Sequence, residues 1–433
     1  MRPGLAGVGR TVFNGSRIEE FKAEILGVLE NVGPGQSLVL ARLSGGPLES
    51  TGVLQGMSGS PVYIDGRLLG AVAMTFAYSK EPVAAIRPIQ DLLRAGEDRQ
   101  ARRAQLRASP GEAELALAVE PVQSIPAGGT RLVDIATPIW FAGFGRQTLA
   151  YFSPRLRLLG LEPQQGISGG GRLEPGLGDP AMLQPGAMIS VQLMTGDMSV
   201  GADGTVTYID GNKVYAFGHR FLALGATEIP FALSEVLALL PSLQSSFKIS
   251  APRRWMGAIL ADRSTGVAGE LGRKVALVPL LISVTSRDQQ GRPLRRQDYR
   301  MEMVADSVLS PLLVQMALSS AIEATERSVG NSTLSLRGEI RFEGQAAPIR
   351  LGNSYAGDLS LPQLASTGAA SPLAYAMQSG LDGLRLKEIV LEVDSYPERR
   401  QAQIDQVWTS RRQARPGESV ELNVVLTTAT GAE

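Results

Sequence analysis

The stretch GMSGSPVYIDGRLLGAVAMTF, residues 56–76, is the most informative for the fold. Its two apolar segments flank Asp65-Gly66, a pair that favours a tight hairpin turn because both residue types tolerate positive φ. A glycine- and serine-rich turn stands directly before the first of these segments. The sequence therefore predicts a β-hairpin with a short polar motif at its mouth.

Similar turn signals occur on both sides of this hairpin. Asn14-Gly15 separates two extended segments near the start, and residues 204–219, GTVTYIDGNKVYAFGH, repeat the hairpin pattern around Asp210-Gly211. Residues 18–29 fit a strand, but their apolar spacing also fits an amphipathic helix. With 49 Gly and 26 Pro in the chain, many turns between short strands are expected. The sequence thus predicts a mainly β fold.

A few helices and loops complete the expected organisation. Residues 307–328 predict a helix, with Asp306 as its N-cap and an apolar face at helical spacing. A short helix is expected around residues 233–240, and residues 95–118 favour a charged surface helix and linker. Residues 166–186 predict a long loop, which lacks the Lys-Ser/Thr pair of a phosphate-binding loop.

Composition excludes several kinds of function. The 433 residues include 42 Lys plus Arg and 42 Asp plus Glu, so the net charge of zero gives no basic excess for nucleic acid or an anionic membrane. The chain has no Cys and one His, which excludes thiolate chemistry and cages of several imidazoles. We therefore expect no metal and no cofactor. The apolar runs are too short for a membrane-spanning helix. The sequence also agrees with a mature form from which an export signal has been removed.

The turn around Ser58 has the features of a nucleophilic serine. Such a serine needs an exposed hydroxyl on a tight turn and backbone N–H groups that converge on a developing oxyanion, and flanking glycines permit both. By analogy with the Gly-x-Ser-Gly arrangement of chymotrypsin-like peptidases, Gly56 and Ser58 would supply those N–H groups. A Gly/Ser-rich β-turn without catalytic role is the alternative.

His219 is the only imidazole in the chain. A His between a Gly and an Arg is compatible with a purely structural role, yet its place at the end of a hairpin, combined with the Ser58 turn, matches a nucleophile and its base. The two residues are far apart in sequence, so folding has to bring them together.

Three segments resemble the stage IV sporulation protein B type serine peptidases. They are TGVLQGMSGSPVYIDGRLLGAVAMTF around Ser58, GTVTYIDGNKVYAFGH ending at His219, and MGAILADRSTGVAGELG at residues 256–272, with a weaker likeness in residues 18–29. The resemblance implies a chymotrypsin-like double β-barrel, with Ser58 as nucleophile and His219 as general base. It also implies a serine endopeptidase, or a self-processing one, that acts on a protein or peptide substrate outside the cytoplasm.

The resemblance, together with the sequence patterns outside it, suggests a division of the chain. Residues 1–95 form the serine-bearing half, and 96–185 form a linker with an inserted β-rich segment. Residues 186–350 form the histidine-bearing half, and 351–433 form a β-sandwich-like module that is either small or cut short. In the family the His segment precedes the Ser segment, so the order in this chain is permuted.

The orienting acid of the triad is not assigned by the sequence. The family has an Asp shortly before its serine motif, but Arg42-Leu43-Ser44-Gly45-Gly46 holds no acid here. Asp262, Glu49 and Asp197 are weak candidates, because each is better explained as a turn or surface acid. The alternative functions are a catalytically inactive or latent β-rich scaffold or binding protein of the cell envelope, and an esterase with the same Ser–His chemistry.

Overall fold

The computed structural model describes residues 1–33, 35–76, 79–95, 105–108, 115–118, 124–127, 130–165, 173, 176–243, 245–325, 332–357, 360–381, 383–428 and 431–432. Strands account for most of them, with five α-helices among the described elements. The predicted fold class, mainly β with a few helices, is confirmed. Residues 18–29 lie within one long strand, so the helical alternative there is excluded.

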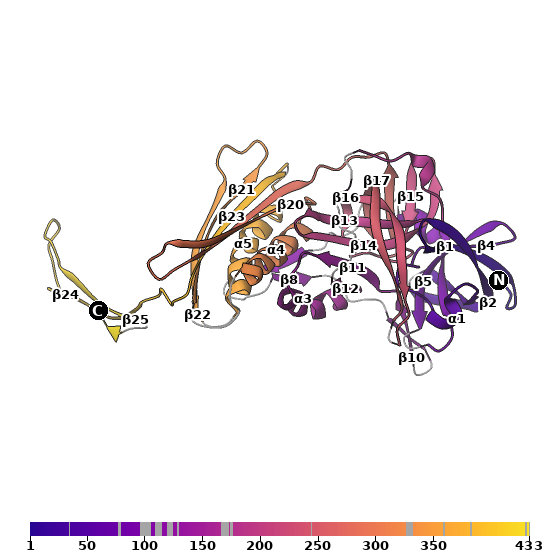
Figure 1. Cartoon of the computed structure of the whole chain (residues 1–433), viewed down its shortest axis with the longest axis horizontal. Helices are drawn as coiled ribbons and strands as arrows, with labels where there is room; N and C mark the ends of the chain where they lie inside the picture. Colours follow the sequence, from indigo (N-terminus) through magenta and orange to yellow (C-terminus); the bar gives the residue numbers. More distant parts are fainter. Residues whose placement is uncertain are drawn as a thin grey trace.

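The first six strands close into a barrel (Figure 1). Each of them pairs antiparallel with two neighbours, in the ring order β1-β2-β3-β6-β5-β4 and back to β1. Alternate side chains point inward, and Phe21, Ile25 and Leu43 are among the fully buried ones. The strands are β1 (Ala6–Asn14), β2 (Arg17–Gly33), β3 (Gln36–Ser44), β4 (Pro61–Ile64), β5 (Arg67–Phe76) and β6 (Val83–Pro88).

A second ring of six strands has the same connectivity. Its order is β13-β14-β15-β18-β17-β16 and back to β13, all antiparallel. In both rings the third strand is followed by a crossing to the far side of the first strand. The strands are β13 (Met188–Gly196), β14 (Ser199–Asp210), β15 (Lys213–Ala216), β16 (Gly225–Leu240), β17 (Phe247–Arg263) and β18 (Gly266–Leu271).

Shorter elements connect and flank the two barrels. Two strands extend the first barrel at β5, and β11 pairs with β14 at the second barrel. The helix α3 packs against β12 beside them. These elements are α1 (Leu48–Thr51), α2 (Ile89–Ala95), β7 (Gln105–Ala108), β8 (Leu115–Ala118), β9 (Ser124–Ala127), β10 (Thr130–Asp134), β11 (Thr137–Ala142), α3 (Arg146–Leu158), β12 (Leu161–Gln165) and the 3₁₀ turn η1 (Pro180–Met182).

The remaining chain continues the sheet of the second barrel and covers it with two helices. The strands β20, β19, β23, β21 and β22 follow β13 in one sheet, and α4 and α5 pack on it. As predicted, the Asp306 carboxylate accepts the N–H groups of Val308 and Leu309 at the start of α4. Bounds are β19 (Val278–Arg287), β20 (Pro293–Met303), α4 (Leu309–Thr325), β21 (Ser332–Phe342), β22 (Ile349–Gly357), α5 (Leu361–Met377) and β23 (Leu386–Tyr396).

The last strands form a small sheet of their own, made of β24 (Gln403–Thr409), β25 (Leu422–Thr428) and β26 (Gly431–Ala432). Figure 1 shows it at the opposite end of the molecule from the first barrel. Residues 351–433 are therefore divided between the large sheet and this separate one. None of the described helices is long and apolar enough to cross a membrane.

Two predicted helices are strands in the structure. The segment around residues 233–240 belongs to β16, because it pairs along its length with β17, and a short run of Leu and Ala fits a buried helix or a strand equally well. Within residues 95–118, β7 and β8 pair with each other instead of forming a helix. The rest of that interval beyond α2 lies outside the described residues.

Candidate active site

The serine turn lies between α1 and β4 of the first barrel. Its two flanking glycines have positive φ, 88° at Gly56 and 92° at Gly59, a conformation that favours glycine. The Gly59 N–H donates to Val72 O at 2.8 Å and ties the turn to β5. Ser58 is fully buried, and its Oγ has no hydrogen-bond partner among the described residues.

Two backbone N–H groups of this turn have no hydrogen-bond acceptor among the described residues. Met57 and Ser60 donate within the turn, to Leu54 O and Met57 O respectively. In the part of the chain that the structure describes, the N–H groups of Gly56 and Ser58 donate to no acceptor. These are the two donors that the sequence predicts for an oxyanion hole.

The turn rests on β14 of the second barrel. The N–H of Thr205 donates to Ser58 O at 2.9 Å, and the Thr205 hydroxyl donates to Gly56 O at 2.8 Å. A Cβ at Gly59 would lie 2.0 Å from Thr205 O, so only glycine allows this contact. The first barrel carries the serine turn, and hydrogen bonds from the second barrel hold the turn in position.

His219 lies in the loop between β15 and β16 and is 2% exposed. Its Nδ1 is 2.7 Å from the carbonyl oxygen of Arg220. A carbonyl can only accept, so Nδ1 carries the proton of this hydrogen bond. Burial lowers the pKa of His219, although the carboxylate of Asp134 opposes the shift. The neutral imidazole therefore has its lone pair on Nε2, which has no partner among the described residues.

The serine turn and the histidine loop meet at one carbonyl. Val72 O accepts the N–H of Gly59, and it lies 3.0 Å from the position of a Cβ on Gly218. Gly59 follows Ser58, and Gly218 precedes His219. A Cβ on Gly59 would also lie 2.6 Å from Phe217 N. The fold thus brings the two predicted residues into one buried region.

Asp134 is a further acid near His219, and it is absent from the sequence-based candidates. It ends β10, where it pairs with Met74 of β5 and is 8% exposed. Burial raises the pKa of Asp134, while the nearby charges of His219, Arg87 and Arg220 oppose that rise. Its Oδ1 has no hydrogen-bond partner within the described ranges. No motif or turn signal marks this residue, and strand pairing alone brings it to the site.

The three acids proposed from the sequence have other surroundings. Glu49 is exposed on α1. The Asp197 carboxylate accepts the N–H of Arg300 on β20. The Asp262 carboxylate shapes the histidine loop, because it accepts backbone N–H groups of three residues that follow His219. The donating N–H groups belong to Phe221, Leu222 and Leu224.

Residues 71–74 form the buried middle of β5, next to the serine turn. On one side β5 pairs with β6. On the other side it pairs first with β4 and then, from Met74 to Phe76, with β10. The N–H of Ile135 continues this pairing by donating to Ala73 O at 3.0 Å. The edge of β5 beside the serine turn is therefore covered by the chain itself.

A buried polar network lies under the serine turn. The ammonium of Lys248 donates to the hydroxyl of Thr11 at 2.7 Å, and the N–H of Lys248 donates to Gln55 O at 3.2 Å. Asp203 accepts from Ser250 at 2.6 Å and from the indole of Trp140. Burial lowers the pKa of Lys248 to about 7 and raises that of Asp203 to about 6.

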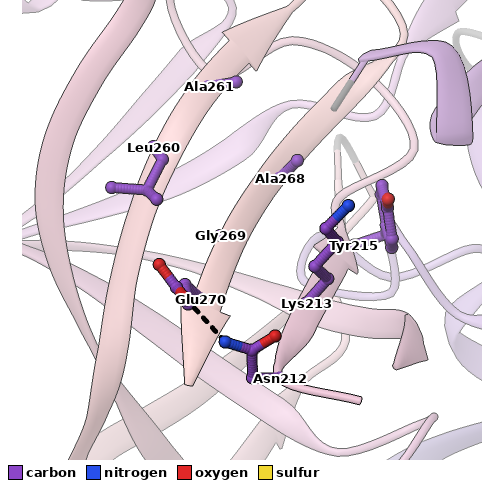
Figure 2. A pocket seen from close by; sticks show the side chains of 8 residues that line it. All are labelled: Asn212, Lys213, Tyr215, Leu260, Ala261, Ala268, Gly269 and Glu270. Carbon is purple, nitrogen blue, oxygen red and sulfur yellow. Dashed lines mark hydrogen bonds between the residues drawn. The ribbon is translucent and has the colours of Figure 1, made fainter. Parts of the chain in front are cut away.

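The described residues hold no cluster of metal ligands, and the cavity on the second barrel lies away from Ser58 and His219. No group of three or more His, Asp or Glu residues in the described part of the chain could hold a metal ion. A cavity of about 170 Å³ lies elsewhere, on the second barrel between β15, β17 and β18 (Figure 2). Asn212 and Glu270 are hydrogen-bonded at its edge, at 2.6 Å. Ser58 and His219 do not line it.

Comparison with known proteins finds a family that matches the first barrel, which includes Ser58. The model of the family described as SpoIVB peptidase S55 matches residues 2–83. No curated protein and no solved structure matches the chain. The matched residues include Ser58 and its turn, while His219 lies outside them. Through its first barrel the chain is similar to the SpoIVB S55 peptidases, and this similarity indicates a serine peptidase, a hydrolase.

Proposed function

We propose that the chain is a serine endopeptidase with a chymotrypsin-like pair of barrels, in which Ser58 is the nucleophile and His219 the general base. The observation that carries the proposal is the hydrogen bond from His219 Nδ1 to the carbonyl of Arg220. It fixes the tautomer whose Nε2 can accept a proton, a role that an aspartate fulfils in the usual triad.

The reaction is an acyl transfer in two halves. Ser58 Oγ attacks the carbonyl carbon of the peptide, and its proton moves to His219 Nε2. The N–H groups of Gly56 and Ser58 bind the oxyanion of the tetrahedral intermediate. The imidazolium then protonates the leaving amine as the C–N bond breaks. A water molecule, deprotonated by His219, releases the acyl group and restores Ser58.

Asp134 fits the third role in this scheme. Its carboxylate favours the charged form of His219, as the direction of its effect on the imidazole pKa indicates. It would stabilise the imidazolium that forms during both halves of the reaction. Because Arg220 O already fixes the tautomer, Asp134 acts through its charge.

A latent form of the same peptidase is the second candidate. Ser58 is 0% and His219 2% exposed, and β10 covers the edge of β5 where an extended peptide could pair. Substrate access to Ser58 then requires this region to open. Catalytic hydrogen bonds are often formed only in the complex with substrate, which agrees with the separate Oγ and Nε2 atoms.

The test is labelling with a fluorophosphonate probe, mapped by mass spectrometry, together with hydrolysis of a peptide library. We expect labelling at Ser58 that is lost in Ser58→Ala and His219→Ala, with hydrolysis lost in both variants. Ser60→Ala is the matched control, because Ser60 is equally buried and its Oγ also has no partner among the described residues. Equal, measurable labelling and turnover in wild type and Ser58→Ala would disprove the role of Ser58. No labelling and no turnover in either protein would favour a non-catalytic binding protein or the latent form.

Hydrolysis of esters without any cleavage of peptides would instead favour an esterase. The same Ser–His chemistry serves both reactions, so the point mutants do not separate them, and the substrate series does. Localisation outside the cytoplasm is also part of the proposal. Fractionation of the cells that naturally produce the protein tests it.

A further inference from the structure

The loop that carries His219 has a strained backbone. Phe217 has φ 71° and Ala223 has φ 56°, a left-handed conformation that is costly for residues with a side chain. The N–H of Gly218 donates to Ala216 O at 2.9 Å, which closes a three-residue turn around Phe217. A turn of this size with positive φ at its centre is rare and strained. Something in the surrounding structure has to hold it.

Contacts at the two ends of the loop hold it. At the C-terminal end, Asp262 of β17 accepts three loop N–H groups, as described above. At the N-terminal end, the guanidinium of Arg87 donates through Nε to Gly218 O at 2.9 Å. Arg87 belongs to β6 of the first barrel, so this hydrogen bond crosses from one barrel to the other. It ends on the peptide bond that joins Gly218 to His219.

Arg87 is itself fixed in place. It is 1% exposed, and its Nη1 donates to the side chain of Gln36 at 3.3 Å. The charges facing it are those of Asp134 on β10 and Asp91 on α2. A buried guanidinium with two anchored donors has little freedom, so its acceptor Gly218 O is held as well.

We propose that Arg87 is a positioning residue, which holds the peptide between Gly218 and His219 so that the imidazole faces Ser58. This inference rests on the proposed function for its catalytic consequence. Without Arg87, the strained turn can relax by rotation of that peptide, and the imidazole moves with it. A displacement of about 1 Å can cost about 100-fold in rate.

The single histidine makes the test direct. His219 gives the only imidazole Cε1–H signal of the chain, so its chemical shift and its titration can be followed by NMR in the whole protein. We compare wild type with Arg87→Met and Arg87→Lys. The charged groups that act on His219 are Asp134, Arg87 and Arg220. Arg87 lowers the imidazole pKa, so its removal raises that pKa, whereas Lys keeps the charge.

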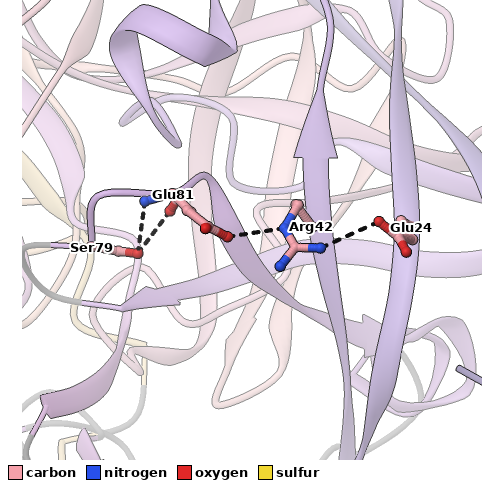
Figure 3. Close-up of polar contacts among 4 residues, drawn as sticks. All are labelled: Glu24, Arg42, Ser79 and Glu81. Carbon is pink, nitrogen blue, oxygen red and sulfur yellow. Dashed lines mark hydrogen bonds and ion pairs between the residues drawn. The ribbon is translucent and has the colours of Figure 1, made fainter. Parts of the chain in front are cut away.

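The control variant is Arg42→Met. Arg42 lies on β3 of the same barrel and pairs with Glu81 at 2.9 Å and with Glu24 at 3.4 Å, at the surface (Figure 3). We expect Arg42→Met to keep the imidazole signal, its titration and the wild-type kcat. In Arg87→Met, kcat falls about 100-fold with little change in KM, and the imidazole signal moves.

Arg87→Lys separates the effect of the guanidinium geometry on His219 from the effect of the positive charge. Because it keeps a buried positive charge, it is also less disruptive to folding than Arg87→Met. Lysine retains the charge beside Asp134 and Asp91 but lacks the planar guanidinium, so the titration of His219 stays close to wild type while kcat falls about 10-fold or more. An imidazole signal unchanged in both Arg87 variants overturns the inference, whatever the activity. The imidazole signal could move in the Arg87 variants while the wild type shows no hydrolysis that depends on Ser58. That result would contradict the proposed function and leave the positioning role of Arg87 in place.

Discussion

The N–H of Thr205 in the second barrel donates to the carbonyl of Ser58 in the first barrel at 2.9 Å. This hydrogen bond anchors the serine turn to β14, a strand that is remote from Ser58 in sequence. The Thr205 side chain adds a second bond to the same turn, at Gly56 O. The geometry of the serine turn therefore depends on the contact between the barrels as much as on the residues of the turn itself.

Gly59→Ala should disrupt this contact. Its Cβ would lie 2.0 Å from Thr205 O, at a φ of 92°. We expect a loss of at least about 3 kcal/mol in the free energy of unfolding, from overpacking and positive φ together. Gly66→Ala is the control, because Gly66 also has positive φ but no atom lies within 4 Å of the position that its Cβ would take. Urea denaturation compares the two, and equal losses would contradict the prediction.

Asp134→Asn should change the pH dependence of hydrolysis. Its carboxylate raises the pKa of His219, so the variant has a lower imidazole pKa. Activity needs the neutral imidazole, and the acid limb of kcat/KM should therefore move to lower pH. The plateau should fall about 10- to 100-fold, less than in a triad where the acid also fixes the tautomer.

The control for that experiment is Glu49→Gln, because Glu49 is an exposed acid near the start of the serine segment. It should leave both the plateau and the acid limb unchanged. An acid limb in Asp134→Asn that coincides with wild type would rule out an electrostatic role for Asp134.

Lys248→Met should remove a pH dependence of stability. The pKa of Lys248 is lowered to about 7 in the fold, from 10.5. Between these two values the unfolded chain binds a proton that the native chain does not, so the free energy of unfolding rises with pH by about 1.4 kcal/mol per unit. Below pH 7 both states bind the proton, and this contribution is constant.

Urea unfolding at pH 7 and pH 9 measures that rise. The wild type should gain stability relative to Lys248→Met over this interval. Lys274→Met, at an exposed lysine, should follow the wild type. Parallel curves for Lys248→Met and wild type would contradict the buried position of the Lys248 ammonium.

Leu132→Ala should loosen β10 and speed the reaction of Ser58 with a fluorophosphonate. Leu132 is fully buried where β10 pairs with β5. Its truncation should cost about 2–5 kcal/mol and favour local opening at that edge. We expect labelling at Ser58 to become about 10-fold faster or more.

Leu43→Ala provides the comparison, since Leu43 is equally buried in the first barrel but lies on β3. It should lower global stability without a matching gain in labelling rate. A similar acceleration in both variants would mean that global unfolding exposes Ser58, and the latent form would lose its support.

The local features of the sequence predicted the parts of the site that depend on turns. Asp65-Gly66 and Asp210-Gly211 occur at the expected hairpins, and Gly56 and Gly59 have the positive φ that the serine turn needs. Such turns are encoded within a few residues, so a single sequence shows them. The candidate nucleophile, the candidate base and the mainly β class were accessible for this reason.

Other parts depend on contacts between distant strands. Asp134 ends a strand with no turn signal, and its place beside His219 follows from the pairing of β10 with β5. Arg87 is one basic residue in an apolar strand, and only the packing of two barrels makes it buried. The helix predicted at 233–240 is wrong because the pairing of this segment with β17 is not visible in its composition.

The matching connectivity of the two barrels bears on the order of the two candidate catalytic residues along the chain. Ser58 follows the third strand of one ring, and His219 follows the third strand of the other. The two loops therefore occupy equivalent places in two barrels of the same connectivity, and they meet at Val72 O. If the two barrels were encoded in the opposite order, the contact between these two loops would be preserved. The order of Ser58 and His219 along the chain then depends only on which barrel comes first in the sequence, and the contact between their two loops does not depend on that order.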